Sequence, residues 1–422
     1  MKKHPLIIVL GLYSIMTCQL SLADDMSTQL RQLQTQINQL QIKIESIHPI
    51  TNTVQVNPAM PLGEFYSAYS LLQIQNQYTS PLTLGAEFLA AMQRWGGSAL
   101  NGIIGPRGSY PSNGSALAAT TANADILVNM NDWTHTFIAV QGGLNGYPTI
   151  ISDAFLNFGD VSKSPYYATI GKTTLPFGSF PGDGPLTNTL ADNAFDSTEL
   201  TQVDVGYSTK KLNSELALFN GQNSINNFVL SMQYNTASAP LTWGLGTGYM
   251  NDIRYSGNDI AAAYGTSNGR YNISSGLLQG GANSAVDINS NLAYSLTSTQ
   301  SLFTAAEWIS TTSSATIRST NNATGKMQAW TLTGGYTIPI ENKSTTFAID
   351  YSATTNMRDV PLQLPGAINE TALSMLGIKS QWLGYFNMEV SRHIYVGPEF
   401  AWQKMYNGQH TWESALTVTA YL

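Results

Sequence analysis

The sequence predicts an all-β fold: a transmembrane antiparallel β-barrel of about sixteen strands, preceded by a short N-terminal α-helical coiled coil. Three observations support this prediction. The chain begins with an export signal, charged residues make up only 11% of its 422 residues, and apolar and polar side chains alternate along much of it. So little charge is unusual for a soluble protein of this length, whereas a barrel has apolar outer positions and uncharged polar inner ones.

Residues 1–23 have the features of a secretory signal peptide. A basic start is followed by a mostly apolar run up to Leu22, and Ala23 completes a small-residue cleavage site. The alternatives are a retained membrane anchor, for which the apolar run is short, and lipidation at Cys18, which lacks a small residue before it. Cys18 is the only cysteine, so a chain cleaved at this site has no disulfide and no cysteine-based metal or catalytic site.

Residues 24–48 predict a periplasmic coiled coil. Apolar residues recur at alternating spacings of three and four, with polar and charged residues between them. The positions expected to drive oligomerisation are Leu30, Leu33, Ile37, Leu40, Ile44 and Ile47. The pattern leaves dimer and trimer open, and a single amphipathic helix lying on the barrel or membrane is the alternative. Prolines then punctuate residues 49–83, which we interpret as a linker.

Residues 84–422 predict the barrel itself. Here bulky apolar side chains alternate with small or polar ones, as in strands that have one face in lipid and the other in a hydrated interior. The clearest example begins at Leu241, where Leu241, Trp243 and Leu245 alternate with threonine and glycine. Tyrosine and tryptophan are plentiful, at 21 and 8 residues, which suits aromatic belts at the two membrane interfaces.

Connection lengths separate a membrane barrel from a soluble β-sandwich, which also shows alternation. Every second predicted connection is short, and the others include long segments rich in glycine, serine, asparagine and threonine. The long segments span roughly residues 95–123, 175–198, 251–282, 312–325 and 354–382. Short periplasmic turns and long external loops are typical of the outer membrane of Gram-negative bacteria. Both ends of the barrel, and with them the coiled coil, are then expected on the periplasmic side.

Charges on the inner wall and in the external loops are the candidate functional residues of such a barrel. The residues expected to line the lumen are Asp153, Lys172, Asp204, Glu215, Asp287, Glu307, Asp350, Glu389, Glu399 and Glu413. An interior of this kind favours cations and disfavours polyanions. The alternative is that many of these acids pair with neighbours or face bulk water, where they cost and contribute little.

Arginines in the predicted external loops are candidates for capturing an anionic ligand. They are Arg107, Arg254, Arg270, Arg318 and Arg358. The guanidinium group matches carboxylate and phosphate geometry, so these residues could bind a ferric polycarboxylate siderophore. The other interpretation is contact with lipopolysaccharide phosphates, which would serve anchoring alone. Capture of an anion also conflicts with transit through an acidic interior.

The remaining patterns argue against an enzyme or a nucleic-acid-binding protein. The net charge of −7 disfavours nucleic acid as a partner. The histidines are scattered without metal-ligand spacing, and the glycine pairs lack the spacing and lysine of a phosphate loop. No metal or cofactor is therefore expected. His135, between Thr134 and Thr136, is the one weak candidate for an outer-wall phospholipase.

The run from Tyr167 to Phe180, with Gly184-Pro-Leu-Thr187 and the stretch Asp196-Ser-Thr-Glu-Leu200 after it, resembles the central region of the LbtU-type siderophore porins. The resemblance implies a periplasmic helical segment, a barrel of about sixteen strands and passage of an iron-loaded siderophore without a plug domain. Its specific part covers roughly residues 165–200. The loop after Phe180 departs from the family pattern, and this departure concerns the identity of the ligand. The final Leu422 also departs from it, and this departure concerns only the assembly of the barrel.

These observations lead to three functional interpretations. The first is an outer-membrane channel for a small solute, with a ferric siderophore as the candidate, and the second is a general diffusion porin. The third is a structural or adhesive barrel whose coiled coil or loops bind other components. The expected partners are outer-membrane lipid and lipopolysaccharide, a small-molecule solute, and further copies of the chain through the coiled coil.

Overall fold

The computed structural model describes most of the predicted barrel and a short segment before it. The described residues are 67–74, 80–100, 104–105, 108–109, 112–142, 149–197, 199–221, 224–257, 278–279, 283–317, 324–358, 360, 362–365, 373–374 and 377–422. The predicted signal peptide and coiled coil, with Leu30 to Ile47, lie outside them. Among the described helices, none has the length and apolar character needed to cross a membrane.

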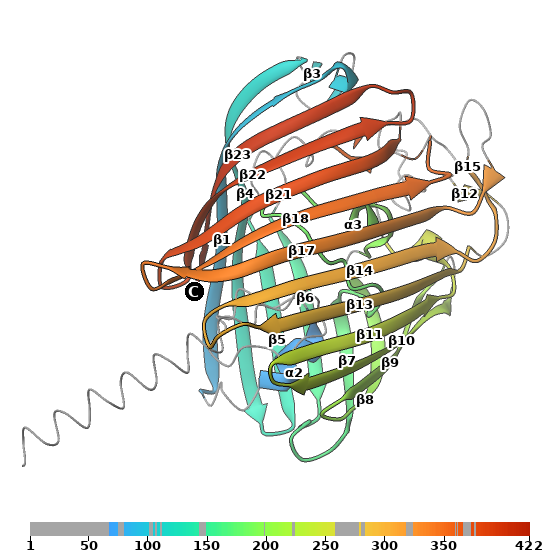
Figure 1. Ribbon diagram of the computed structural model, residues 1–422. Coiled ribbons are helices and arrows are strands. Elements are labelled where there is room, and N and C mark those ends of the chain that lie inside the picture. The colour runs from blue at the N-terminus through green and yellow to red at the C-terminus, as the bar shows by residue number, and fades with distance from the viewer. Residues whose placement is uncertain are drawn as a thin grey trace, which may run out of the picture.

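Sixteen antiparallel strands form one closed barrel, as the alternation predicted (Figure 1). In chain order they are β1 (Leu82–Gly96), β4 (Asn113–Asn131), β5 (Thr134–Gln141), β6 (Ile150–Phe158), β7 (Tyr166–Thr173), β8 (Leu200–Ser208), β9 (Leu212–Asn220), β10 (Ile225–Ser238), β11 (Leu241–Met250), β13 (Ala285–Ser295), β14 (Ser301–Thr311), β17 (Gln328–Ile340), β18 (Lys343–Thr355), β21 (Ile378–Ser391), β22 (Ile394–Met405) and β23 (His410–Tyr421). Each strand pairs with its neighbours along the chain, and β1 pairs with β23 to close the ring.

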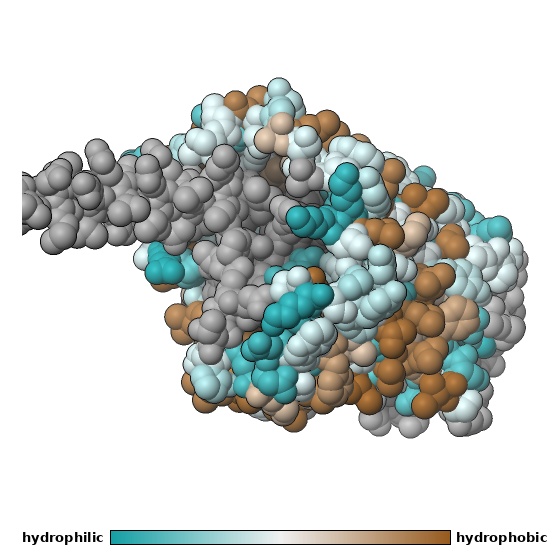
Figure 2. Space-filling view, turned by 90° about the horizontal axis from the view of Figure 1, so that it is seen from below, coloured by the Kyte–Doolittle hydropathy of each residue, from teal (hydrophilic) through white to brown (hydrophobic). Residues whose placement is uncertain are grey.

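The two faces of each strand have different chemistry. In β23, Leu416 and Val418 are exposed on the outer face, whereas Glu413 and Thr417 are buried on the inner face. The same division holds in β11, where Leu245 is exposed and the glycines beside it are buried. Figure 2 shows apolar residues gathered on the flank of the barrel. An outer surface of this kind is stable only against hydrocarbon, which supports placing the barrel in a membrane.

A row of aromatic side chains follows the outer face across neighbouring strands. Trp308 pairs in register with Trp330, Tyr351 with Trp382, and Trp382 with Trp402. The rings of Tyr351 and Trp382 lie 4.6 Å apart, centroid to centroid. Tryptophan and tyrosine gather where a barrel meets the interface between lipid and water, so this row marks one membrane boundary.

The connections alternate between short and long, as the sequence predicted. At one rim the turns are short, for example between β4 and β5 and between β21 and β22. At the other rim the long connections carry small elements of their own: β2 (Ile104–Gly105), β3 (Gly108–Ser109), β12 (Leu278–Gln279), β15 (Ala315–Ile317), β16 (Thr324–Gly325), β19 (Leu362–Gln363), β20 (Leu373–Ser374), η3 (Ser98–Leu100) and η4 (Ile253–Tyr255).

One predicted loop was too long. Residues 113–123 belong to β4, whereas the sequence placed them in a connection from 95 to 123. This stretch consists of alanine, serine, threonine, asparagine and glycine with a single leucine, so it lacks the bulky apolar residues that reveal alternation. Its pairing with β1 is nonetheless continuous from Gly96 to Leu82, with one register shift.

A short helix, α2 (Ala68–Ile74), lies inside the barrel, although the sequence placed these residues in a linker. Leu71 packs with Phe137 and Phe155, which point inward from β5 and β6. The Tyr69 ring stacks on Tyr167 of β7 at 5.4 Å. Both buried leucines, Leu71 and Leu72, are 1% exposed. The segment was not recognised because a helix buried on several sides shows no polar face.

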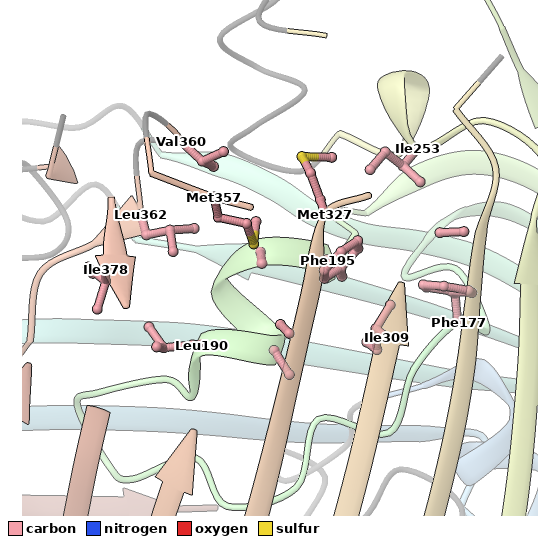
Figure 3. Packing of buried hydrophobic residues seen from close by; sticks show 14 of the residues in the cluster. Phe177, Leu190, Phe195, Ile253, Ile309, Met327, Met357, Val360, Leu362 and Ile378 are labelled. Atoms are coloured by element: carbon pink, nitrogen blue, oxygen red, sulfur yellow. The ribbon is translucent and has the colours of Figure 1, made fainter. Parts of the chain in front are cut away.

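A second helix, α3 (Leu190–Phe195), lies in the connection between β7 and β8 and is buried along its whole length. Figure 1 shows α3 within the outline of the barrel, beside β17 and β18. Leu190 and Phe195 belong to an apolar cluster that includes Met327, Met357 and Ile378 (Figure 3). The inner wall is therefore apolar near the long connections, where the sequence predicted a polar lumen, because α3 and these connections cover it.

Candidate channel interior

The connection between β7 and β8, residues 174–199, crosses the inside of the barrel. It leaves β7 and packs through α3 against β17 and β18, with further contacts to β14 and β21. In the order of strands around the ring, β18 lies opposite β7 and β8. The segment therefore spans the lumen from one wall to the other, and we call it the crossing segment.

Two buried glutamates of the opposite wall hold the crossing segment. The backbone N–H of Ser179 donates to Glu307 Oε1 at 2.6 Å, and that of Phe180 donates to Glu307 Oε2 at 3.0 Å. The backbone N–H of Leu186 donates to Glu399 Oε2 at 2.8 Å. Both glutamates were expected to line the lumen. They instead satisfy backbone donors of a segment that lies across it.

Further contacts fix the rest of the segment. The Leu190 N–H donates to Ser352 Oγ on β18 at 3.1 Å, and Gln381 Nε2 on β21 donates to the carbonyl oxygen of Asn188 at 2.8 Å. At Gly182, which has φ of +93°, a Cβ atom would overlap Thr333 and Asp350. Only glycine allows this approach of the backbone to the wall.

Asp183 is a buried acid within the crossing segment. It accepts a hydrogen bond of 2.6 Å from the backbone N–H of Thr189. Burial raises the pKa of the Asp183 carboxyl well above its usual value, and the nearby carboxylates of Asp192, Asp196 and Asp350 raise it further. The packed segment therefore favours the protonated form of this carboxyl.

The inner face of the strands is acidic. The predicted residues that have inward parity are Asp153, Asp204, Glu215, Asp287, Glu307, Asp350, Glu389, Glu399 and Glu413. Glu87 and Asp125, on the neighbouring strands β1 and β4, also point inward and were missed. Both lie at inward positions of the predicted period, so a strict count along β1 and β4 would have found them. None of the described barrel strands presents a lysine or arginine to the interior.

Lys172 does not have the inward position that the sequence assigned to it. In β7 the buried inner positions are Tyr167, Thr169 and Thr173, which places Lys172 on the outer face with Tyr166. Its Nζ donates to the carbonyl oxygen of Ile151 at 2.6 Å. A lysine can occupy this face near the end of a strand because its long side chain brings the charge to the polar boundary.

Two of the inner acids have free oxygens. Neither oxygen of Glu413 and neither oxygen of Asp350 has a hydrogen-bond partner among the described residues, although Thr333 lies beside Asp350. Both side chains are buried, at 0% and 1% exposure. The carboxyls of both residues are therefore groups of the wall that still need hydrogen-bond donors.

The external arginines are not brought together as a ring by the described residues. Arg254, in η4, donates from Nη2 to Asp252 Oδ2 at 2.5 Å and lies 5.5 Å from the Tyr255 ring. Its charge is therefore already compensated by an acid. Arg358 is exposed, and Arg107, Arg270 and Arg318 lie outside the described residues.

The described residues also bear on the metal and enzyme alternatives. Within them, no cluster of three or more histidine, cysteine or acidic side chains has the geometry to hold a metal ion. His135 is 4% exposed on the inner face, and its Nδ1 lies 2.8 Å from Asn129 Oδ1. It therefore does not lie on the lipid-facing wall, where a phospholipase centre would need it.

Comparison with solved structures places this architecture among outer-membrane porins. The structure of OprB from Pseudomonas putida matches with a TM-score of 0.52 and 9% identity, covering 83% of this chain and 96% of that chain. The anion-selective porin from Comamonas acidovorans matches with a TM-score of 0.50 and 9% identity, covering 81% and 99%. The outer-membrane channel DcaP of Acinetobacter baumannii has a TM-score of 0.49 and 11% identity, covering 82% and 98%.

At these identities the likeness shows the fold, which is a porin-like outer-membrane barrel of the Gram-negative type. No curated protein sequence matches the chain. Residues 52–278, which are more than half of the chain, match the family model described as "Protein of unknown function (DUF3573)". The chain therefore belongs to the DUF3573 family.

Proposed function

We propose that the protein is a channel that passes small solutes and prefers cations to anions. The observation that carries this proposal is the single sign of charge on the inner wall: acids point inward from strands all around the ring, and the described strands present no inward lysine or arginine. Rings of carboxylates of this kind lower the energy of a cation and raise that of an anion in a narrow pore.

The crossing segment supports selection by size as well as charge. It occupies the lumen between opposite walls, and α2 occupies a further part beside β5 to β8. Solutes must therefore pass close to the wall, where a carboxylate at about 4 Å contributes about 1 kcal/mol even in a water-like medium. In a wide, open pore the same charges would be screened within a distance of about 8 Å at physiological salt.

Reversal potentials in planar lipid bilayers test the proposal. Under a potassium chloride gradient, we expect the purified chain to prefer potassium over chloride. Asp153→Asn combined with Glu389→Gln, which changes two inward acids that are only partly buried, should lower this preference by about fivefold for each carboxylate, from about 1 kcal/mol of lost attraction. Glu341→Gln is the matched control, because Glu341 is exposed in the turn between β17 and β18. A chloride preference would contradict the proposal, and a folded chain without conductance would favour a structural or adhesive barrel.

For the solute, we propose a ferric siderophore complex that is not anionic. The resemblance of residues 165–200 to the LbtU-type siderophore porins supports a siderophore, and the acidic wall supports a neutral or cationic complex over a ferric polycarboxylate. Arg254 adds little to anion capture, because it already pairs with Asp252.

Liposomes that contain the protein provide the test of this solute. We expect saturable entry of a labelled ferric hydroxamate and slower entry of a labelled ferric polycarboxylate. Equal permeation of both complexes and of unrelated sugars would instead favour a general diffusion porin.

A further inference from the structure

The interior holds a cavity that the channel proposal does not by itself explain. It lies between α2 and the start of the crossing segment, against the wall formed by β8 to β13, and it has a volume of about 70 Å³. A cavity of this size has room for several waters or a small organic group. Ser67 and Tyr69 of the α2 segment border it on one side, and Leu175 and Phe177 on another.

The wall of the cavity carries two rows of polar residues that are aligned in register. Glu215 of β9 pairs with Ser231 of β10, which pairs with Gly248 of β11, and Gly248 pairs with Asp287 of β13. In the adjacent row, Gln233 of β10 and Asn289 of β13 flank Gly246. The side chains of Gln233 and Asn289 pack over Gly246 and the Phe177 ring packs over Gly248, and all three side chains border the cavity.

Hydrogen-bond donors on this wall are already engaged. Gln202 Nε2 donates to the carbonyl oxygens of Thr173 and Thr174, at 3.0 and 2.9 Å. Asn289 Nδ2 donates to Asp287 Oδ2 at 2.7 Å, and Asn213 Nδ2 donates to Glu215. These bonds use the amide N–H groups of Gln202, Asn213 and Asn289. Several acceptor oxygens of the same wall are left without a donor.

Among the described residues, four acceptor oxygens of this wall have no donor: Gln202 Oε1, Asp204 Oδ1, Asp287 Oδ1 and Asn289 Oδ1. All four residues border the cavity, and each is at most 5% exposed. The carboxyl of Asp204 also lies against that of Glu215, and the carboxyl of Asp287 lies against that of Glu307. A buried acceptor without a donor costs about 1–3 kcal/mol, and more when it is charged. None of the described residues bordering the cavity is a lysine or arginine, so the charge is not compensated from the wall.

From these contacts we propose that the cavity binds an organic cation with several N–H donors, such as a polyamine. Four buried acceptors need donors, and the acids need positive charge. A single metal ion cannot contact both Glu215 and Asp287, because these residues lie three strands apart, roughly 14 Å along the wall at about 4.8 Å per strand. A flexible chain with an ammonium group near each end can reach both.

This inference rests on the proposed preference for cations and names a class of ligand for the same interior. Tyr69 gives the site a cover, because its hydroxyl bonds to Ser208 Oγ at 2.6 Å and holds α2 against β8. Phe177 lies against Gly248, where a Cβ atom would approach its ring to 3.1 Å. The cavity is therefore enclosed by two segments that lie in the lumen.

Isothermal titration of the full chain in detergent micelles with spermidine tests the proposal. We expect one saturable site, and at least about tenfold weaker binding after Asp204→Asn with Asp287→Asn, since each lost charge-assisted bond changes affinity severalfold. Tetramethylammonium, which has the charge without N–H donors, should not bind. Glu341→Gln is the matched control, because it removes an exposed carboxylate in the turn between β17 and β18, outside the cavity, and should leave spermidine binding unchanged.

A second variant tests the cavity without changing its charge. Ser231→Leu would fill the space between the acidic ends and should abolish spermidine binding. This variant tests the cavity even if the aspartate variant folds poorly. Resistance of the barrel to unfolding in detergent on gels verifies the fold of each variant. Spermidine binding that is absent from the folded wild type, equal in Ser231→Leu, or matched by tetramethylammonium would overturn the inference. Cation preference in bilayers is measured separately, so either proposal can fail alone.

Discussion

At the residue scale, the carboxylates of the inner wall divide into those that hold protein and those that are free. Glu307 and Glu399 accept backbone hydrogen bonds from the crossing segment. Asp350 and Glu413 have oxygens without partners among the described residues. Acidic residues of the inner wall thus position the crossing segment at some places and set the charge of the lumen at others.

Removal of Glu307 should loosen the crossing segment. Glu307→Ala leaves the N–H groups of Ser179 and Phe180 without their acceptor, and a buried donor without a partner costs about 1–3 kcal/mol. We expect larger and noisier single-channel conductance and faster proteolytic cleavage between residues 174 and 199. Glu413→Gln should leave cleavage at the wild-type rate. A rigid segment in Glu307→Ala would show that the apolar contacts of α3 suffice.

From the buried carboxyl of Asp183, we predict that the packing of the crossing segment depends on pH. Because its folded pKa is raised, the stabilising contribution is fully present below the ordinary carboxyl pKa of about 4 and is lost as the pH rises through the folded value. We expect the crossing segment to loosen and the conductance to rise with increasing pH. Asp183→Asn should flatten this profile. A conductance that remains equally dependent on pH in Asp183→Asn would contradict this prediction.

Parity along the strands was enough to predict which acids point inward, since alternation is a local property of a strand. The parity rule failed for Lys172. The long side chain of a lysine at the end of a strand can reach the polar boundary of the membrane from either face of the strand. The partners of Glu307 and Glu399 could not be predicted, because they come from a segment more than a hundred residues away in sequence.

At the scale of elements, the interior is built from two short segments rather than from a separate domain, within the part of the chain that the structure describes. The crossing segment contains most of the residues that resemble the LbtU-type siderophore porins. Its prolines and glycines indicated a connection between strands. Its path across the lumen depends on contacts with β14, β18 and β22, which alternation along one strand does not encode. The same limit applies to α2, whose seven residues are stabilised by inward side chains of several strands.

Loss of α2 packing should widen the lumen. Leu71→Ala with Leu72→Ala removes two fully buried side chains, at a cost of about 2–5 kcal/mol each. We expect α2 to detach and the single-channel conductance to increase, while the barrel stays folded. Leu84→Ala is the matched control, since Leu84 is 66% exposed on the outer face. An unchanged conductance would indicate that solutes do not pass on the α2 side.

At the scale of the whole molecule, strand number, strand position and the alternation of connection lengths were predicted well, because each follows from a pattern within about ten residues. The coiled coil expected from Leu30 to Ile47 stays a prediction, since those residues lie outside the described part. The apolar packing at the end of the barrel with the long connections was not predicted. In the sequence, Phe219, Met250 and Ile309 look like ordinary strand ends. In the structure they belong to the apolar cluster that includes α3 and the long connections.

The closure of β1 on β23 has a consequence for how the protein is assembled. Every other pairing in the ring joins strands that follow one another in the chain, so hairpins can form soon after their residues are available. The seam alone brings together the first and last strands and therefore has the largest single loop-closure cost in the ring. Until it forms, both edge strands expose unpaired backbone groups that can pair with another chain, so the unfinished ring is prone to aggregation.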